Sequence, residues 1–261
     1  MPELPEVENR LVYFQKTALG ETIERVVVTA PGMIKSSSAA RFARSLAGRR
    51  MCQAERRGKY LIITLDDDRA LILHFGMGGE LSYYRDSRER PEFTRIEFFL
   101  ASGARLAFTC PRKICRVLLV SDLDRVPALK EMGPEPLASN FSLGYLERVM
   151  EESPARQVKP LLMDQRKIAG VGNIYADEIL FKSGVRPDRL CSSLVGKEIE
   201  RIHRETRRVL RRAIGTGGDQ PPEDFLVSRS WRGARCRRCR QPIEKKTIGG
   251  RTSYFCPECQ R

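Results

Sequence analysis

Four cysteines near the end of the chain constrain its fold more than any other feature. They form two Cys-x-x-Cys pairs, Cys236–Cys239 and Cys256–Cys259, with sixteen residues between the pairs. Each pair can turn two thiolates towards one cation, and four thiolates complete the tetrahedral coordination of a structural zinc ion. A site with four protein ligands has no open position for a substrate. We therefore expect one structural zinc ion that folds the tail and takes no part in chemistry.

The residues between the two pairs predict a β-hairpin. The ranges 243–248 and 252–255 contain β-branched and aromatic residues, and Gly249-Gly250 between them suits a tight turn. Arg251 directly follows the turn. Its side chain is therefore placed to meet a phosphate or a base.

The charge of the chain narrows the class of partner. The 261 residues include 47 Lys and Arg against 33 Asp and Glu, a formal net charge of +14. Such a charge favours a polyanionic partner, because phosphate contacts release condensed counterions; the alternative is a generally basic, solvated surface. The chain has no apolar run of about 18 residues, the minimum for a membrane span. It begins with acidic and proline residues instead of a signal sequence. We expect no membrane partner.

The other four cysteines, Cys52, Cys110, Cys115 and Cys191, are scattered along the chain. Without a secretion signal, a reducing compartment and metal ligation explain the cysteines better than a framework of disulfides. We therefore expect these four side chains to be ordinary thiols of the core or the surface. The expected location is the cytoplasm.

The first half of the chain predicts one helix followed by β-structure. Over residues 6–19, Val7, Leu11 and Phe14 recur at helical spacing, and Gly20 follows. From residue 22 to about 120, short segments rich in β-branched and aromatic residues alternate with turns, apart from one short helix. The segments are 22–29, 60–65, 70–75, 95–100 and 105–109, and the helix is 39–46. We expect neighbouring segments to pair as antiparallel hairpins in a two-layer β-sandwich with flanking helices.

The second half of the chain is helical up to the cysteine-rich tail. Residues 121–136 are rich in Asp, Pro and Gly and are expected to form a linker. Apolar residues at helical spacing then mark four helices, around 146–150, 158–162, 173–182 and 195–209. Arginines follow another face of the last helix. This face is interpreted equally well as exposed to solvent or as binding phosphate. We predict an α+β fold with a β-sandwich domain at 1–125, a helical domain at 126–220 and the zinc hairpin at 221–261.

Residues 168–175 join two of the predicted helices and contain Gly170 and Gly172. Glycines allow the positive φ of a tight turn, and their amides can approach an anion closely. The next helix begins near Asn173, so its positive end faces the same anion. A Gly-x-Gly turn is also common in helical hairpins without a ligand, but basic residues nearby, among them Lys159, favour a phosphate site.

The first eight residues, Met-Pro-Glu-Leu-Pro-Glu-Val-Glu, carry the most chemical information. A small second residue permits removal of Met1, which exposes a secondary amine at Pro2. An α-amino group titrates near pH ~8, so part of it is neutral and nucleophilic at physiological pH. Glu3 is adjacent and Glu6 is one helical turn away, where carboxyl groups can move protons for the amine. A retained methionine would make the Pro2 nitrogen a tertiary amide and exclude this chemistry.

This opening segment, the segment GVGNIYADEIL at 170–180 and the four-cysteine hairpin together resemble the formamidopyrimidine-DNA glycosylase (Fpg, MutM) family. The family also includes endonuclease VIII (Nei); the form Leu-Pro-Glu-Val-Glu is more similar to the Fpg branch. The resemblance spans nearly the whole chain and implies a β-sandwich domain, a helix-two-turn-helix domain and a zinc finger, with DNA held in the cleft between the domains. It also implies base-excision repair by a DNA glycosylase with AP-lyase activity. Such an enzyme removes oxidised or ring-opened bases through an imine at Pro2, followed by β-elimination and, where it occurs, δ-elimination.

The resemblance also implies roles for catalytic residues. Pro2 attacks C1′ of the damaged nucleoside, Glu3 is the general acid/base and Glu6 supports the site. Lys59, in Arg57-Gly58-Lys59-Tyr60, matches the family's β-hairpin lysine, which contacts DNA and assists catalysis.

Further residues match the family's DNA-binding positions. Asn173 and Arg251 match phosphate clamps around the flipped nucleotide, and His74 falls on a position near the DNA backbone. Met77 and Arg112 match side chains that fill the void left by the extruded base. Together with Gly172 and Lys159, these residues form the expected DNA-binding surface.

Two segments depart from the family pattern. The family's Asp-Pro-Arg-Arg-Phe-Gly loop is here Cys-Pro-Arg-Lys-Ile-Cys at 110–115, so Ile114 replaces the aromatic wedge. Isoleucine can insert between bases but stacks less well. Residues 215–235, which in Fpg enzymes include the loop over the everted 8-oxoguanine, are shortened and altered. The sequence is therefore compatible with three kinds of substrate: 8-oxoguanine, ring-opened purines and oxidised pyrimidines.

Two other functions fit parts of the sequence. A catalytically silent relative with altered specificity would bind lesions or abasic sites without cutting, but Pro2, Glu3 and Lys59 are all present and favour activity. A zinc-ribbon transcription or RNA-binding factor would explain the tail and the charge but leaves the N-terminal segment unexplained. The expected partner is double-stranded DNA that contains damaged bases or abasic sites, bound by a monomer.

Overall fold

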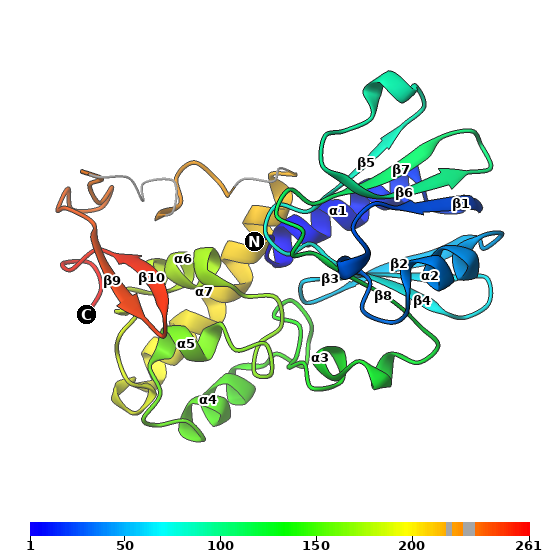
Figure 1. Ribbon diagram of the computed structural model, residues 1–261. Coiled ribbons are helices and arrows are strands. Elements are labelled where there is room, and N and C mark those ends of the chain that lie inside the picture. The colour runs from blue at the N-terminus through cyan, green and yellow to red at the C-terminus, as the bar shows by residue number, and fades with distance from the viewer. Residues whose placement is uncertain (218–220, 227–232) are drawn as a thin grey trace. The chain divides into compact units, whose positions relative to one another are not determined.

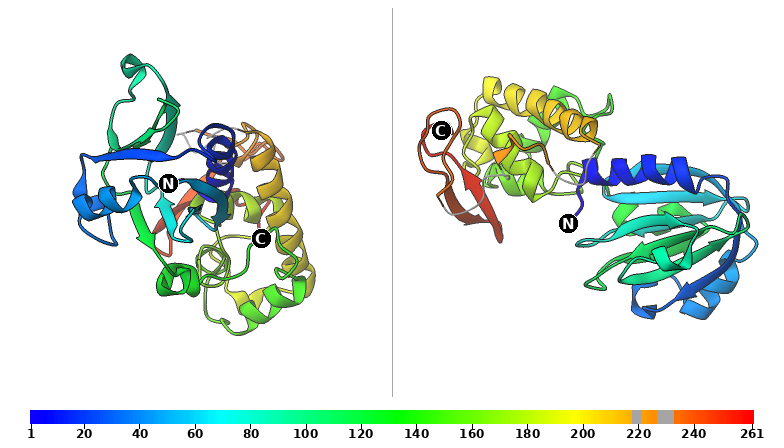
Figure 2. Two further views of the ribbon diagram at one scale, coloured as in Figure 1. Left: turned by 90° about the vertical axis from the view of Figure 1, so that its right-hand side faces the viewer. Right: turned by 90° about the horizontal axis from the view of Figure 1, so that it is seen from above.

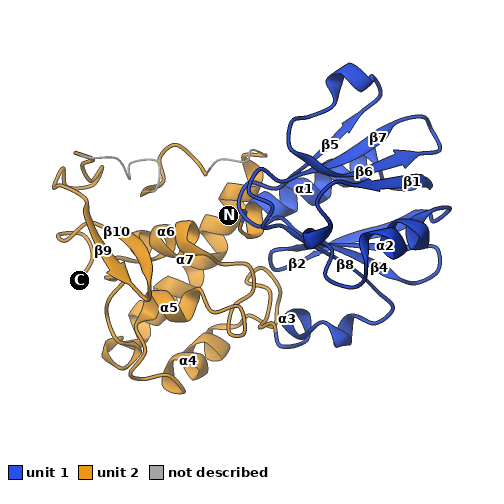
Figure 3. Ribbon diagram, viewed as in Figure 1, with its two compact units in different colours: residues 1–2, 6–131 blue, residues 3–5, 132–261 orange. Residues whose placement is uncertain are grey.

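The computed structural model describes residues 1–217, 221–226 and 233–261. The chain forms two compact units, the first made of residues 1–2 and 6–131 and the second of residues 3–5 and 132–261 (Figure 3). The chain thus enters the second unit for three residues near its start and then returns to the first. Among the described residues, no helix has the length and apolar character needed to cross a membrane.

The first unit contains two antiparallel sheets of four strands each, which confirms the predicted β-structure of this half of the chain (Figure 1). One sheet has the strand order β1-β6-β7-β5 and the other β2-β3-β4-β8. The strands are β1 (Ile23–Val28), β2 (Met51–Arg57), β3 (Tyr60–Leu65), β4 (Ala70–His74), β5 (Glu80–Tyr84), β6 (Thr94–Leu100), β7 (Arg105–Thr109) and β8 (Arg116–Val120). The sequence did not predict β2, β5 and β8. All three are outer strands of their sheets, and in β2 and β5 polar side chains weaken the apolar pattern.

One hydrophobic core joins the sheets and two helices of this unit. Helix α1 (Leu4–Thr17) runs along the sheets, and Val7, Leu11 and Phe14 on its inner face are buried in that core (Figure 2). Helix α2 (Ala39–Leu46) has the predicted bounds. It begins after Ser38, whose side chain accepts a hydrogen bond from the Arg41 amide and caps the helix. Short 3₁₀ turns η1 (Pro31–Met33) and η2 (Ser87–Glu89) lie in the connections.

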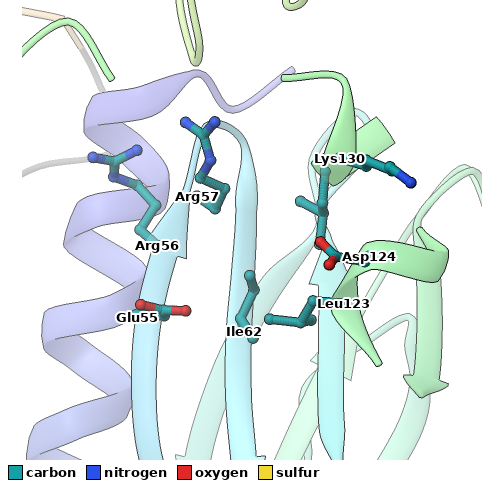
Figure 4. Close-up of a pocket in the computed structure, with 8 residues that line it drawn as sticks. Glu55, Arg56, Arg57, Ile62, Leu123, Asp124 and Lys130 are labelled. Carbon is teal, nitrogen blue, oxygen red and sulfur yellow. The ribbon is translucent and has the colours of Figure 1, made fainter. Parts of the chain in front are cut away.

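The segment expected to be a plain linker contains two short helices instead. These are η3 (Leu123–Arg125) and α3 (Pro127–Lys130). The sequence of this segment is rich in Pro and Asp, which is typical of irregular structure. Beside β2 and β3 they enclose a pocket of about 200 Å³ within the first unit. Ile62 and Leu123 face each other across its floor (Figure 4).

The second unit is built from helices around its own core, with the hairpin of the tail packed on one of them. Its helices are α4 (Leu143–Glu151), α5 (Val158–Leu162), α6 (Asn173–Ser183) and α7 (Gly196–Gly215), with the turn η4 (Cys191–Ser193). The hairpin strands are β9 (Glu244–Ile248) and β10 (Arg251–Phe255), joined by two glycines with positive φ as predicted. Phe181 of α6 packs with Cys236 and Cys256 in a small apolar cluster. Helix α6 therefore supports the cysteine-rich tail.

The structure bears in part on two regions singled out in the sequence, the arginines of the last helix and the altered segment at 215–235. On α7, Arg204 and Arg208 are exposed and pair with Glu205, so their known partners lie on their own helix. Of the altered segment at 215–235, residues 218–220 and 227–232 lie outside the described residues.

Candidate functional site

The Glu3 carboxylate lies at the amino end of α6 in the second unit. Its Oε2 atom accepts hydrogen bonds from the amides of Gly172 (2.8 Å) and Tyr175 (3.3 Å), and its Oε1 atom accepts one from Ile174 (2.9 Å). The first turn of a helix offers unpaired amides and a partial positive charge, both of which stabilise a carboxylate. Glu3 is 3% exposed, so these amides replace the water that its charge has lost.

Two glycines permit this close approach. A Cβ atom at Gly172 would lie 2.3 Å from Cδ of Glu3, and one at Gly170 would lie 2.6 Å from Cβ of Leu4. Gly170 also has a φ of +77°, and its carbonyl accepts a hydrogen bond from the Leu4 amide (3.0 Å). In the structure the Gly172 amide is buried and donates to Glu3, so the contact of Gly172 with a phosphate of DNA stays a prediction.

Lys159, predicted to lie on the DNA-binding surface, is fully buried. Its Nζ atom lies 2.7 Å from Oδ1 of Asp177 and donates to Oγ of Ser253 (2.6 Å). Burial lowers the pKa of the Lys159 ammonium and raises the pKa of Asp177 to about 6, with each partner opposing the shift of the other. The structure thus shows Lys159 in a buried ion pair, and its contact with DNA stays a prediction. The ammonium joins α5, α6 and β10.

This junction places the tail hairpin beside the Glu3 site. The Thr252 carbonyl accepts hydrogen bonds from Nδ2 of Asn173 (3.1 Å) and from Nζ of Lys159 (3.2 Å). The Tyr254 amide donates to Oδ2 of Asp177 (3.1 Å). Arg251 is exposed at the start of β10 and directly precedes Thr252, whose carbonyl bonds Asn173 at the start of α6.

The four cysteines of the tail meet at one point. The Sγ atoms of Cys236 and Cys259 are 3.8 Å apart, those of Cys239 and Cys256 are 3.4 Å apart, and all four lie within 4.8 Å of one another. Tetrahedral zinc with Zn–S bonds of about 2.3 Å separates its sulfur ligands by about 3.8 Å. The donor set therefore fits one structural zinc ion. Four thiolates leave that ion no position for a substrate, as the sequence predicted.

In the first unit, Lys59 lies at the tip of the hairpin between β2 and β3. Arg57 pairs with Tyr60, which leaves a two-residue turn with Gly58 in its first position at a φ of +54°. The Arg56 guanidinium donates to Oε2 of Glu8 (2.6 Å) and to the Gly58 carbonyl (3.2 Å). The hairpin tip is thereby tied to α1, the helix that follows Pro2 and Glu3 in the chain.

Arg10 ties the same helix to a second loop. It is 7% exposed and donates to the Glu6 carbonyl (3.0 Å) and to the Gly79 carbonyl (3.2 Å), and its guanidinium lies over the Phe75 ring. Sequence reasoning missed this residue. The available signal was a cation at helical spacing among the apolar side chains of α1.

His74 ends β4 close to two cations. Burial lowers its pKa to about 4, with added repulsion from Arg116 and Lys59. Its Nδ1 atom accepts a hydrogen bond from the Gly76 amide (3.4 Å), and its ring lies against Tyr60. With Nδ1 as the acceptor, the neutral ring carries its proton on Nε2, which leaves that atom as a hydrogen-bond donor.

Met77, Arg112 and Ile114 lie on two neighbouring loops of the first unit. Met77 and Ile114 are 44% and 47% exposed, unusual values for large apolar side chains, and an Arg112 Nη1 atom lies 3.6 Å from Sδ of Met77. Cys110 and Cys115, expected to be thiols, form a disulfide that brackets the second loop. In the sequence, the sign of this disulfide was that cysteines replace the first and last residues of the family's Asp-Pro-Arg-Arg-Phe-Gly loop.

Pro2 is buried and is the last residue of the first unit before the chain enters the second at Glu3. Met1 before it is 50% exposed. The methionine thus lies at the surface, while the proline ring is packed.

Family models match almost the whole chain. The model of the formamidopyrimidine-DNA glycosylase N-terminal domain matches residues 1–117, and the model of the formamidopyrimidine-DNA glycosylase H2TH domain matches residues 132–221. A third model, the zinc finger found in FPG and IleRS, matches residues 233–261.

Individual relatives agree over their full length. The formamidopyrimidine-DNA glycosylase of Pelotomaculum thermopropionicum is 37% identical over 100% of this chain and 99% of its own. That of Geobacillus kaustophilus is 37% identical over 100% of both chains. The solved structure of the Lactococcus lactis enzyme, bound non-covalently to DNA containing an AP site, superposes with a TM-score of 0.91 at 30% identity, covering 99% of each chain. The MutM (Fpg) protein of Thermus thermophilus gives 0.84 at 36% identity, over 99% of this chain and 98% of its own.

We predict that His74 makes the protein sensitive to acid. Its pKa is about 4 in the folded state against 6.5 when unperturbed. The stabilisation by the neutral ring is fully present above pH 6.5 and is lost as the pH falls towards 4. His74→Gln should reduce the loss of unfolding free energy between pH 7 and 4 by about 1–3 kcal/mol, measured by urea unfolding. His203→Gln, at the other histidine of the chain, is the control, and identical pH curves for wild type and His74→Gln would contradict the assignment.

Removal of zinc should unfold the tail hairpin and spare the β-sandwich. An unfolded tail has no preformed site, so the free energy of zinc binding is largely folding free energy of the tail. Hydrogen–deuterium exchange after chelation should show fast exchange in β9 and β10 and unchanged protection in β3 and β4. Protection of β10 that survives complete loss of zinc would refute this role.

Proposed function

The chain belongs to the formamidopyrimidine-DNA glycosylase family, and we propose that it removes oxidised or ring-opened bases from double-stranded DNA and then cleaves the strand as an AP lyase. The proposed nucleophile is the secondary amine of Pro2 after removal of Met1. A substrate of this kind agrees with the net charge of +14 and with the AP-site DNA bound by the Lactococcus lactis relative.

The observation that supports the proposal most is the position of the Glu3 carboxylate. It follows Pro2 directly in the chain, and three amides at the amino end of α6 stabilise its charged form. A carboxylate whose oxygens are fixed by the backbone loses little conformational entropy when it accepts a proton from a neighbouring amine. The pair therefore joins a nucleophile with a prepositioned proton carrier.

The first chemical stage exchanges the base for the amine. The lone pair of the Pro2 nitrogen attacks C1′ of the damaged nucleoside, and the bond from C1′ to the base breaks, with its electron pair leaving on the base, which takes up a proton. Glu3 accepts the proton that the attacking nitrogen loses. It then returns that proton to O4′ as the sugar ring opens, which leaves an iminium between Pro2 and C1′.

The second stage breaks the strand. The iminium withdraws electrons and acidifies the 2′ hydrogen, so loss of that proton forms the C2′–C3′ double bond and expels the 3′ phosphate. A second proton loss, at C4′, can expel the 5′ phosphate in the same way. Water then hydrolyses the imine and releases Pro2.

We assign the phosphate and sugar contacts to Lys59, His74, Asn173 and Arg251. Lys59 at its hairpin tip contacts DNA and assists the chemistry, and Glu6 supports Pro2 from α1. His74 is neutral at physiological pH because of its lowered pKa, so it contributes a hydrogen bond to the backbone and no charge. Asn173 and Arg251 bind the phosphates that flank the flipped nucleotide.

Met77, Arg112 and Ile114 are proposed to occupy the space left by the flipped base. The exposure of the two apolar side chains and the contact between Arg112 and Met77 support this role. Extrusion of a base costs a few kcal/mol in lost stacking, which an inserted side chain partly restores. Ile114 offers less surface for stacking than an aromatic side chain, so we expect weaker discrimination of the base opposite the lesion.

Trapping with borohydride tests the covalent chemistry. An abasic duplex mixed with the processed protein should give a covalent adduct after reduction of the iminium, detected by gel shift and by mass spectrometry of the N-terminal peptide. Pro2→Gly keeps an N-terminal amine but makes it primary and more mobile, and it should lower the trapping rate by about tenfold or more.

The same experiment includes its own controls. Protein that retains Met1 should not be trapped, because its Pro2 nitrogen is an amide. Tight binding of abasic DNA without any adduct, by protein shown to start at Pro2, would reject the enzyme and support a silent lesion-binding relative.

A further inference from the structure

Two buried cysteines enclose the most exposed loop of the proposed wedge. Cys110 and Cys115 are 0% and 1% exposed, whereas all four residues between them, 111–114, are exposed. The disulfide between them closes this loop at its base. The loop therefore has a buried covalent anchor and a solvent-facing tip.

The anchor also holds the neighbouring turn that carries Met77. Sγ of Cys115 lies 3.1 Å from the Phe75 carbonyl oxygen, and a Cβ atom added at Gly79 would lie 2.7 Å from that same sulfur. At Gly76 an added Cβ would lie 2.9 Å from the Ile114 carbonyl oxygen. The loop and the turn thus pack backbone against backbone, with Cys115 as the side chain between them.

Besides this packing and the disulfide, hydrogen bonds hold the ends of the loop: Nε of Arg95 donates to the Cys110 carbonyl (3.0 Å), and the Cys115 amide donates to Sγ of Cys110 (3.3 Å). Lys113 has a φ of +55°, in the left-handed region that disfavours most side chains. Within the loop, the Lys113 amide donates to the Cys110 carbonyl at 3.3 Å, a long hydrogen bond. A short covalent ring removes many of the alternative conformations that such a loop would otherwise visit. The disulfide is therefore the strongest restraint on where Arg112 and Ile114 point.

We propose that Cys110 and Cys115 are positioning residues for the wedge, and that removal of a damaged base depends on the disulfide between them. This inference rests on the proposed function, since it assumes that Met77, Arg112 and Ile114 fill the space of a flipped base. A cellular or added dithiol can open the bond. Two electrons and two protons pass to the cysteines, the S–S bond becomes two thiols, and the dithiol becomes a cyclic disulfide.

The two stages of the reaction should respond differently to reduction. Extraction of a stacked base needs the wedge to stabilise the gap, so a loosened loop slows base removal. A preformed abasic site has no base to extract, and its sugar reacts with Pro2 directly. Reduction should therefore lower base excision and leave the covalent trapping of abasic DNA unchanged.

The test compares the oxidised and dithiol-reduced forms of the zinc-loaded protein. Alkylation and mass spectrometry establish the state of each cysteine. Single-turnover excision of a ring-opened purine should fall by about tenfold on reduction, the scale expected when a supporting group is misplaced. A Cys110→Ser/Cys115→Ser variant should match the reduced form and should not respond to the dithiol. Cys52→Ser, at a thiol outside the loop, should behave as the wild type.

A spectroscopic readout reports the wedge itself. The fluorescence of 2-aminopurine opposite the lesion rises when that base loses its stacking partners, and the oxidised protein should raise it more than the reduced protein. Thermal unfolding of both forms shows whether reduction destabilises the whole unit. A purely structural role would lower excision and trapping together, which would contradict the proposal.

The remaining outcomes are also decisive. Full alkylation of Cys110 and Cys115 before any reductant is added, or equal excision by both forms with trapping intact, would overturn this inference and leave the proposed function standing. Absence of trapping in both forms would overturn the proposed function, and this inference with it.

Discussion

The hydrogen bonds between the Glu3 carboxylate and the amino end of α6 are the interaction on which the rest of the structure depends. They fix a residue of the second unit whose immediate neighbour, Pro2, belongs to the first. A buried carboxylate without partners would be strongly unfavourable, so the helix end and the glycine at 172 must be present before this carboxylate can be placed. The same amides would otherwise be available to a phosphate. In this chain they bond the Glu3 carboxylate, the proton carrier of the proposed mechanism.

Helix α6 connects this carboxylate to the zinc hairpin. Its first turn holds Glu3, Asp177 on its second turn pairs with the buried Lys159, and Phe181 packs on the cysteines of the tail. Removal of one partner from a buried ion pair is costly, because the other charge stays buried without compensation. Zinc therefore acts at a distance from the reaction. By folding the tail, it supplies Ser253 to Lys159 and keeps Arg251 next to the helix that holds Glu3.

Local sequence patterns predicted the elements well, and long-range contacts account for what they missed. The bounds of α2 and β3 and the glycine turn of the tail depend on caps, alternation and turn residues within a few positions, so they were predicted correctly. The hydrogen bond that the Gly172 amide donates to Glu3 joins residues 169 positions apart, and no local pattern reports it. Lys159 was expected to be exposed because a lysine usually is. Its burial follows from Asp177 and Ser253, which only the fold brings to it.

The central claim, that the carboxylate held by α6 carries the proton for the Pro2 amine, is tested most directly with Glu3→Gln. This variant keeps the shape of the side chain and cannot accept or return the proton. Single-turnover excision of a damaged base should fall by about a hundredfold or more, while borohydride trapping on preformed abasic DNA persists, because the open aldehyde needs no proton at O4′. Excision at the wild-type rate, or an equal loss of excision and trapping, would contradict the account.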